Sequence, residues 1–178
     1  MHNPSEHEIS SDREPEVQVI CIGNSVAGDD AIGCEIYARL IEEYLPSNVQ
    51  MTMLGLGGIA LLEHLRGQRL LLIVDAVQLG GDPGDIHIRE IDEILPAETP
   101  AVSLHGISLR DTFDIAEALY SENVPQRTLL IGIEGRNFNE LGIPPSSAVE
   151  AAKEKAVTVI KRLIANMDFR NRCLLDYV

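Results

Sequence analysis

Short hydrophobic runs alternate along the chain with longer segments in which apolar residues recur every three to four positions. The runs at 17–22, 49–54, 70–74 and 128–133 predict β-strands. The run at 70–74, Leu-Leu-Leu-Ile-Val, is wholly apolar, as expected for a strand that is covered on both faces in a parallel sheet. Segment 85–91 alternates between apolar and polar residues, which predicts a half-exposed or edge strand.

The segments between these runs have the pattern of helices. One helix is predicted to begin at Asp29-Asp30 and to end before Pro46, and shorter helices are predicted at 59–65 and 107–121. The last helix follows two prolines, and Ser147-x-x-Glu150 matches a capping box. This order predicts an α/β fold, a single three-layer α/β/α domain with a mostly parallel, twisted five-stranded sheet. We place the domain at 17–167, between a flexible acidic tail at 1–16 and a C-terminal tail at 168–178.

Charge and cysteine content narrow the range of partners. The 178 residues include 14 Lys and Arg against 28 Asp and Glu, a formal net charge of −14. Binding to a phosphate backbone depends on Lys and Arg, so we expect no nucleic-acid partner. No apolar run is long enough to span a membrane, no signal peptide is evident, and three scattered cysteines do not form a disulfide framework. We therefore expect a cytoplasmic protein without membrane insertion, either a monomer or a weak oligomer.

Three polar residues are predicted to meet at one edge of the sheet. Ligands of open parallel sheets bind beyond the carboxyl ends of the strands, where the strand order reverses. With the order 2-1-3-4-5, that point lies between the first strand, which precedes Asp30, and the third, which ends at Asp75. His105 follows a loop on the same side. Two carboxylates and an imidazole suit a divalent first-row metal, although each residue alone could equally cap a helix or anchor a loop.

A second pattern predicts a different ligand. The segment Gly55-Leu56-Gly57-Gly58-Ile59-Ala60 fits G-x-G-x-x-A, and Asp75 stands twenty positions after Gly55. This is the pattern of a dinucleotide-binding turn with its ribose-binding acid, so a dinucleotide-binding module is the alternative hypothesis. A phosphate-binding loop at Gly23–Gly33 is excluded, because Asp29-Asp30 would repel phosphate and no Gly-Lys-Ser/Thr follows.

Four separated motifs resemble those of the nickel–iron hydrogenase maturation endopeptidases. They are Gly23-Asn24-x4-Asp29-Asp30-x-x-Gly33, Ile73-Val74-Asp75-Ala76, Ser103-Leu104-His105 and Ile131-Gly132-Ile133-Glu134. The resemblance covers about residues 17–164, in order and with compatible spacings. It implies a cytoplasmic peptidase that removes the C-terminal extension of a hydrogenase large-subunit precursor after nickel has been inserted.

The resemblance also implies roles for individual residues. The metal-contacting positions of the family fall on Asp30, Asp75 and His105. The nickel arrives in the substrate, and other divalent metals can occupy the site in vitro. Substrate binding or loop shaping falls on Gly23, Asn24, Asp29, Gly57 and Gly58.

One segment departs from the family pattern. The usual Asp-Gly-Gly-Thr reads Leu56-Gly57-Gly58-Ile59 in this chain. A relative that binds a metallated partner without cutting it is therefore a third hypothesis. The catalytic group is left unassigned, because Ser25, Ser103 and Ser108 lack a recognisable constellation of base and orienting residue, and Cys34 is expected to pack within a helix.

Overall fold

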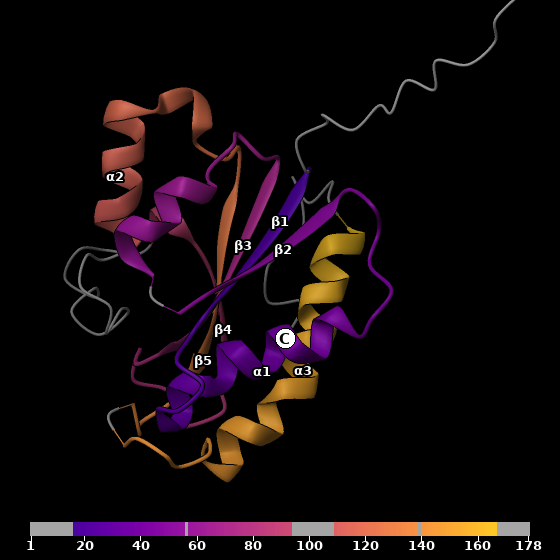
Figure 1. Ribbon diagram of the computed structural model, residues 1–178, viewed down its shortest axis with the longest axis vertical. Coiled ribbons are helices and arrows are strands. Elements are labelled where there is room, and N and C mark those ends of the chain that lie inside the picture. Colours follow the sequence, from indigo (N-terminus) through magenta and orange to yellow (C-terminus); the bar gives the residue numbers. More distant parts are fainter. Residues whose placement is uncertain (1–15, 56, 94–108, 139, 167–178) are drawn as a thin grey trace, which may run out of the picture.

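A twisted five-stranded sheet has helices on both of its faces (Figure 1). The structure is a computed structural model that describes residues 16–55, 57–93, 109–138 and 140–166. The strands are β1 (Val17–Ile22), β2 (Val49–Leu54), β3 (Leu70–Val77), β4 (Ile86–Glu90) and β5 (Thr128–Glu134). The helices are α1 (Ile32–Ile41), α2 (Leu109–Leu119) and α3 (Ser147–Ala165), with short 3-10 helices η1 (Gly28–Ala31), η2 (Gly58–His64), η3 (Ile91–Glu93) and η5 (Ser121–Asn123).

The strand order is β2-β1-β3-β5-β4, and only β4 runs antiparallel to its neighbour. The predicted α/β class and the mostly parallel five-stranded sheet are confirmed, as is the edge position of the segment at 86–90. The expected order 2-1-3-4-5 is wrong in its second half, because β5 lies beside β3 and β4 lies outside it. The connection at 78–85 is too short for a parallel crossover, so β4 returns antiparallel. The crossover through α2 then brings β5 to β3 in the parallel direction.

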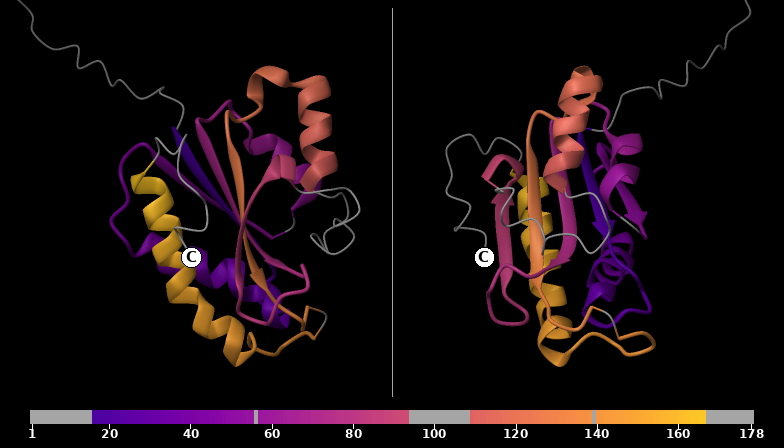
Figure 2. Two further views of the ribbon diagram at one scale, coloured as in Figure 1. Left: turned by 180° about the vertical axis from the view of Figure 1, so that it is seen from behind. Right: turned by 90° about the vertical axis from the view of Figure 1, so that its left-hand side faces the viewer.

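Each face of the sheet packs against its own pair of helices. Alternate residues of a strand point to opposite faces. Val19 and Cys21 lie in the core beneath α1 and α3, whereas Ile20 and Ile22 lie in the core beneath η2 and α2. Figure 1 shows the sheet between these layers, and the right-hand panel of Figure 2 shows its strands side by side, with α2 in front of them and α3 behind. Both cores are apolar and extend along β1, β3 and β5, which explains why those strands lack polar alternation.

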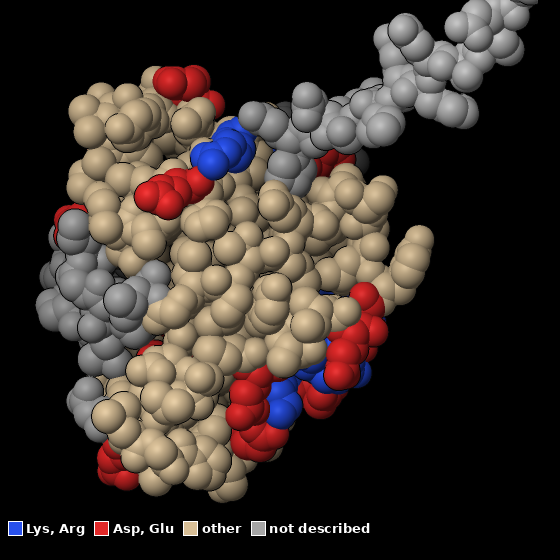
Figure 3. Space-filling view, in the orientation of Figure 1, with Lys and Arg blue, Asp and Glu red and all other residues tan. Residues whose placement is uncertain are grey.

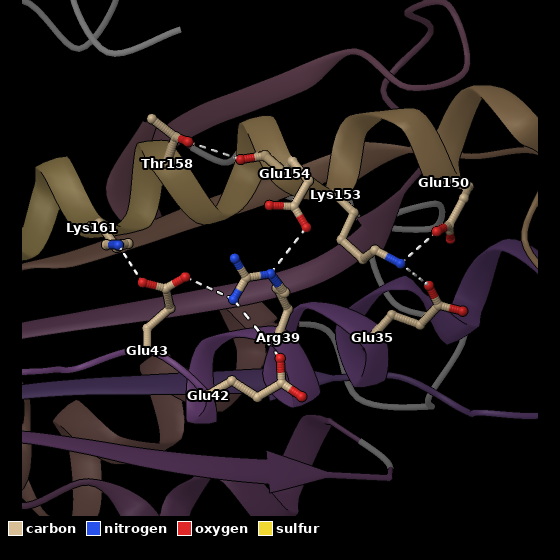
Figure 4. Close-up of polar contacts among 9 residues, drawn as sticks. All are labelled: Glu35, Arg39, Glu42, Glu43, Glu150, Lys153, Glu154, Thr158 and Lys161. Carbon is tan, nitrogen blue, oxygen red and sulfur yellow. Dashed lines mark hydrogen bonds and ion pairs between the residues drawn. The ribbon is translucent and has the colours of Figure 1, made fainter.

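Ion pairs connect α1 and α3 across the surface (Figure 4). Lys153 of α3 contacts Glu35 of α1 at 2.9 Å, and Arg39 of α1 contacts Glu154 of α3 at 3.1 Å. Lys161 extends the network to Glu43, just beyond α1. The space-filling view shows mixed charge gathered in this region (Figure 3). Because the pairs are exposed, we expect each to add little stability and the apolar interface beneath them to dominate.

Element boundaries differ from the sequence-based expectations at three places. β3 continues to Val77, so Asp75 lies within the strand rather than at its end. The 3-10 helix η1 contains the residues expected to open α1, which begins at Ile32. The predicted capping box at α3 is wrong, since Ser147 is the first helical residue and no side chain caps the N-terminus of the helix. Among the helices of the described residues, none has the length and apolar character needed to cross a bilayer.

Candidate functional site

The chain turns sharply beyond the carboxyl end of β1. The Gly23 amide donates to the Leu54 carbonyl at 3.2 Å, which ties the turn to the end of β2. The Asn24 amide donates to the Asp30 carbonyl at 3.2 Å, and a Cβ at Gly23 would lie 2.3 Å from that same oxygen. Only glycine permits this approach. Gly23 and Asn24 therefore shape the turn that brings Asp30 back over the end of β1.

Asp29 anchors a second loop to this turn. Its Oδ2 accepts hydrogen bonds from the Arg136 and Asn137 amides at 2.9 and 3.0 Å, and its Oδ1 accepts one from the Ser146 amide at 2.6 Å. Burial raises the pKa of Asp29, but these three amide bonds outweigh it and hold the pKa below its usual value. Of the two roles that the resemblance allows for Asp29, the contacts support loop shaping.

Gly28 makes the close packing of these two loops sterically feasible. It has φ +54°, and a Cβ at this position would lie 2.2 Å from the Asn137 carbonyl oxygen. The Asp29 amide donates to that oxygen at 2.8 Å. A side chain at Gly28 would push the loops apart and break the hydrogen bonds to Asp29.

Asp30 and Asp75 lie close enough for their charges to interact. Both are buried, with 4% and 2% of their surfaces exposed. Burial raises the pKa of Asp75 well above its usual value, and the negative charge of Asp30 raises it further. The Ala76 amide donates to Asp75 Oδ1 at 2.9 Å and opposes this rise only in part. The structure thus brings together two of the three predicted metal contacts, at the switch point between β1 and β3.

Two thiols lie near this pair of carboxylates. Burial raises the pKa of Cys21, and Cys34 and Asp75 raise it further. Burial also raises the pKa of Cys34, with an added contribution from Asp30. A protonated thiol is a poor nucleophile. The surroundings of both thiols therefore favour the protonated form.

Glu134 organises the rim of the site in a way that sequence reasoning missed. It is the last residue of β5 and is 3% exposed. Its carboxylate accepts hydrogen bonds from the Leu79 amide at 2.9 Å and the Gly80 amide at 3.0 Å, and it contacts His87 Nε2 at 2.9 Å. Glu134 thereby holds the loop that follows β3. The available signal was a buried apolar strand ending on a carboxylate, the same signal that singled out Asp75.

The other predicted residues lie at the edge of the site or outside the described part of the chain. Gly57 precedes η2 and Gly58 is its first residue, next to the end of β1, where a Cβ at Gly57 would lie 3.1 Å from Ile22 Cδ1. His105 and Leu56 lie outside the described residues. Within the described ranges, no three His, Cys, Asp or Glu side chains are grouped to hold a metal ion.

The geometry argues against the dinucleotide alternative. A pyrophosphate is bound by the N-terminus of an α-helix that follows the glycine-rich turn. Here Gly58 opens η2, a 3-10 helix of seven residues. Asp75, the proposed ribose-binding acid, is buried in β3 beside Asp30. An added phosphate group would meet two carboxylates rather than a set of amide donors.

Comparison with known proteins identifies the family. The family model for hydrogenase maturation proteases matches residues 34–163, which is more than half of the chain. This chain belongs to the hydrogenase maturation protease family. The predicted family resemblance is confirmed.

Relatives and solved structures of this family are similar over most of their length. The hydrogenase 2 maturation protease of Escherichia coli strain K12 is 26% identical over 150 residues, 82% of this chain and 90% of the relative. The hydrogenase expression/formation protein HoxM of Azotobacter vinelandii is 30% identical over 154 residues, 85% of this chain and 73% of the relative. The structure of the hydrogenase maturating endopeptidase HybD from E. coli has a TM-score of 0.71 at 27% identity, and the match covers 86% of this chain and 93% of that one.

The anchoring role of Asp29 predicts a large loss of stability in Asp29→Asn. One oxygen would be replaced by an amide group that faces backbone N–H donors. We expect the free energy of unfolding at pH 7 to fall by about 2–3 kcal/mol. A carboxyl with a lowered pKa stabilises the fold above its unfolded pKa, so the loss should shrink below about pH 4. Denaturant titrations across this range test it, and a loss below about 0.5 kcal/mol at pH 7 contradicts the anchor.

The raised pKa of Asp75 predicts the opposite effect for Asp75→Asn. A carboxyl with a raised pKa binds protons more tightly in the folded state, so it destabilises the fold increasingly as the pH rises above about 3.9. We expect Asp75→Asn to raise the free energy of unfolding of the metal-free protein at pH 7 by roughly 1 kcal/mol. The gain should shrink towards pH 4.

Denaturant titrations at pH 7 and pH 5 measure this gain. Asp92→Asn is the matched control, because the Asp92 side chain is 83% exposed, and it should give no pH-dependent gain. Lower stability of Asp75→Asn at pH 7 would show that the Asp75 carboxyl does not destabilise the fold.

Proposed function

We propose that this chain is an endopeptidase that removes the C-terminal extension of a nickel–iron hydrogenase large-subunit precursor after nickel insertion, in the cytoplasm. The proposal depends on one observation above all, the buried Asp30–Asp75 pair at the carboxyl ends of β1 and β3. Neighbouring buried carboxylates both ionise readily only when a cation compensates their charge. Membership of the maturation protease family supports a hydrogenase protein as the substrate.

In this proposal the cation is the nickel that the precursor brings with it. Asp30 and Asp75 supply carboxylate oxygens, and His105 supplies an imidazole nitrogen, a donor set that suits a divalent first-row metal. The raised pKa of Asp75 favours a bound proton in the free protein, and ligation would put the cation in that proton's place. The enzyme's residues thus act as sensors of the precursor's metal and bind no ion of their own between reactions.

The part of His105 in this proposal comes from the family resemblance, because His105 lies outside the described residues. By the alternation of β3, Asp75 shares a face with Ile73 and Val77, which belong to the core beneath η2 and α2.

The same arrangement accounts for a requirement for nickel. A ligand shifts an equilibrium only through a difference in affinity between two states. A nickel-free precursor offers Asp30 and Asp75 no cation, so it makes no metal–carboxylate contacts and the scissile bond is not held in place. A nickel-loaded precursor relieves the repulsion, and the binding energy positions the bond for cleavage.

The departure at Leu56-Gly57-Gly58-Ile59 favours one further candidate function. Ile59 is 52% exposed next to the site, where the resemblance leads us to expect a threonine hydroxyl. A protein with this substitution could bind a metallated precursor without cleaving it. Binding without cleavage in the assay below would assign this second function.

The proposal predicts cleavage that requires both nickel and the carboxylate pair. Incubation with a nickel-loaded precursor should shorten its C-terminus, measured by intact-protein mass, whereas the nickel-free precursor should stay intact. Asp30→Asn and Asp75→Asn should lower the cleavage rate at least about a hundredfold.

Asp92→Asn, at an exposed position, serves as the control and should cleave like the wild type. Equal cleavage of nickel-loaded and nickel-free precursor would refute metal recognition. Full activity of Asp30→Asn would remove the carboxylate pair from the account.

A further inference from the structure

β2 is an edge strand, and the hydrogen bonds show which of its N–H and C=O groups face β1 and which face outward. Among the described strands it pairs only with β1, so its other edge faces away from the sheet. The Asn48 and Leu54 carbonyls accept hydrogen bonds from the Val17 and Gly23 amides, both at 3.2 Å, on the β1 side. Backbone groups of successive residues point to opposite edges of a strand. The even-numbered residues of β2 therefore pair with β1, and the odd-numbered residues point outward.

The outward groups belong to Val49, Met51 and Met53. The Val49 amide donates to the Pro46 carbonyl at 3.0 Å. Within the described part of the chain, no backbone hydrogen bond from outside the sheet reaches Met51 or Met53. Two N–H and three C=O groups therefore form a regular row along this edge.

This edge lacks the protection that edge strands usually have. Natural edges carry charged side chains or proline, which prevent pairing with another chain. The sequence Val-Gln-Met-Thr-Met-Leu contains neither, in a protein with 42 charged Asp, Glu, Lys and Arg residues (14 + 28). β2 is the outermost strand towards the viewer in Figure 1 (compare Figure 2, right), and Figure 3 shows a broad region without charge across the middle of that face. The strand is suited to pair with an extended peptide.

The edge ends at the candidate site. Leu54 is tied to Gly23, where the turn leading to Asp30 begins. Gly57 lies against Ile22 at the end of β1. A peptide that lay along β2 would therefore pass from the outer edge directly onto the rim of the carboxylate pair. Because the outer edge of β2 leads to the candidate site, we take a substrate peptide as the ligand that binds along this edge.

We propose that the outer edge of β2 binds the C-terminal extension of the precursor as an added antiparallel strand. This inference rests on the proposed function. Antiparallel pairing is the commoner arrangement, and it carries the chain from the site towards the start of β2, so the residues after the scissile bond are the ones that pair. Main-chain hydrogen bonds supply the affinity, and the interaction is largely independent of the extension's sequence.

Strand spacing gives the position of the paired segment. An added strand lies about 12 Å from the middle of the β1–β3 crevice, two and a half strand spacings away. Extended chain covers this distance in about four residues. Pairing with Met51 and Met53 therefore begins about four residues after the scissile bond.

Proline at position 51 tests the edge directly. Met51→Pro removes one outward N–H and leaves the hydrogen bonds to β1 intact, and proline is tolerated on an edge strand in this orientation. Met51→Ala shortens the side chain and keeps the N–H, so it provides the baseline. We expect Met51→Pro to raise KM for the nickel-loaded precursor about tenfold above Met51→Ala, with kcat unchanged. Equal KM values in the two folded variants overturn the proposal.

A proline scan of the precursor's extension tests the substrate side with the wild-type enzyme, whatever the folding of Met51→Pro. Prolines at alternate positions should raise KM with a period of two residues, beginning about four residues after the cleavage site. A flat profile, or one without this period, overturns strand addition. A wild-type enzyme that cleaves no precursor would instead refute the proposed function, so the two failures are distinguishable.

Hydrogen exchange and sedimentation exclude the other occupants of the edge. In the free full-length chain the Met51 and Met53 amides should exchange fast. Nickel-loaded precursor bound to the wild type should protect these amides from exchange. The Asp75→Asn variant with the same precursor should protect them less. Slow exchange in the free monomer would assign the edge to another segment of the same chain. A wild-type dimer that Met51→Pro dissociates would assign it to a second copy. Either result overturns the proposal.

Discussion

The repulsion between the Asp30 and Asp75 carboxylates governs what the carboxyl-end edge of this sheet can do. Both side chains are buried, and the negative charge of Asp30 disfavours the ionised form of Asp75. The raised pKa of Asp75 favours its protonated form in the free protein, which lowers this repulsion. A cation removes it by binding to both groups. A site of this kind distinguishes a partner with an exposed metal from one without, which is the discrimination that our proposed function requires.

The surrounding loops keep this unfavourable pair in place. Asp29, adjacent to Asp30 in the chain, accepts three backbone amide bonds and joins the turn after β1 to the loop after β5. Glu134 accepts amide bonds from the loop after β3. Asp29 and Glu134 stabilise the fold through these amide bonds, whereas the raised pKa of Asp75 indicates that ionisation of this buried carboxyl lowers stability. Substitutions of the two kinds should therefore change stability in opposite directions.

The sequence predicted the parts of the structure that depend on local pattern. Apolar runs located β1, β2, β3 and β5, and the rule for parallel sheets located the crevice between β1 and β3. It could not place β5 between β3 and β4, because strand order depends on which crossover packs against which face. The anchors Asp29 and Glu134 also required the structure. Their partners are backbone amides at distant positions, and amide groups have no signature in the sequence.

The account's central claim is that Asp30 and Asp75 bind the precursor because it contains nickel. The most direct test is the ratio of dissociation constants for nickel-free and nickel-loaded precursor, measured by calorimetry at pH 7 for the wild type, Asp30→Asn and Asp75→Asn. We predict that nickel strengthens binding to the wild type at least about a hundredfold, equivalent to about 2.7 kcal/mol, and that the ratio falls close to one in either variant. A ratio that is the same in the wild type and both variants would contradict the claim.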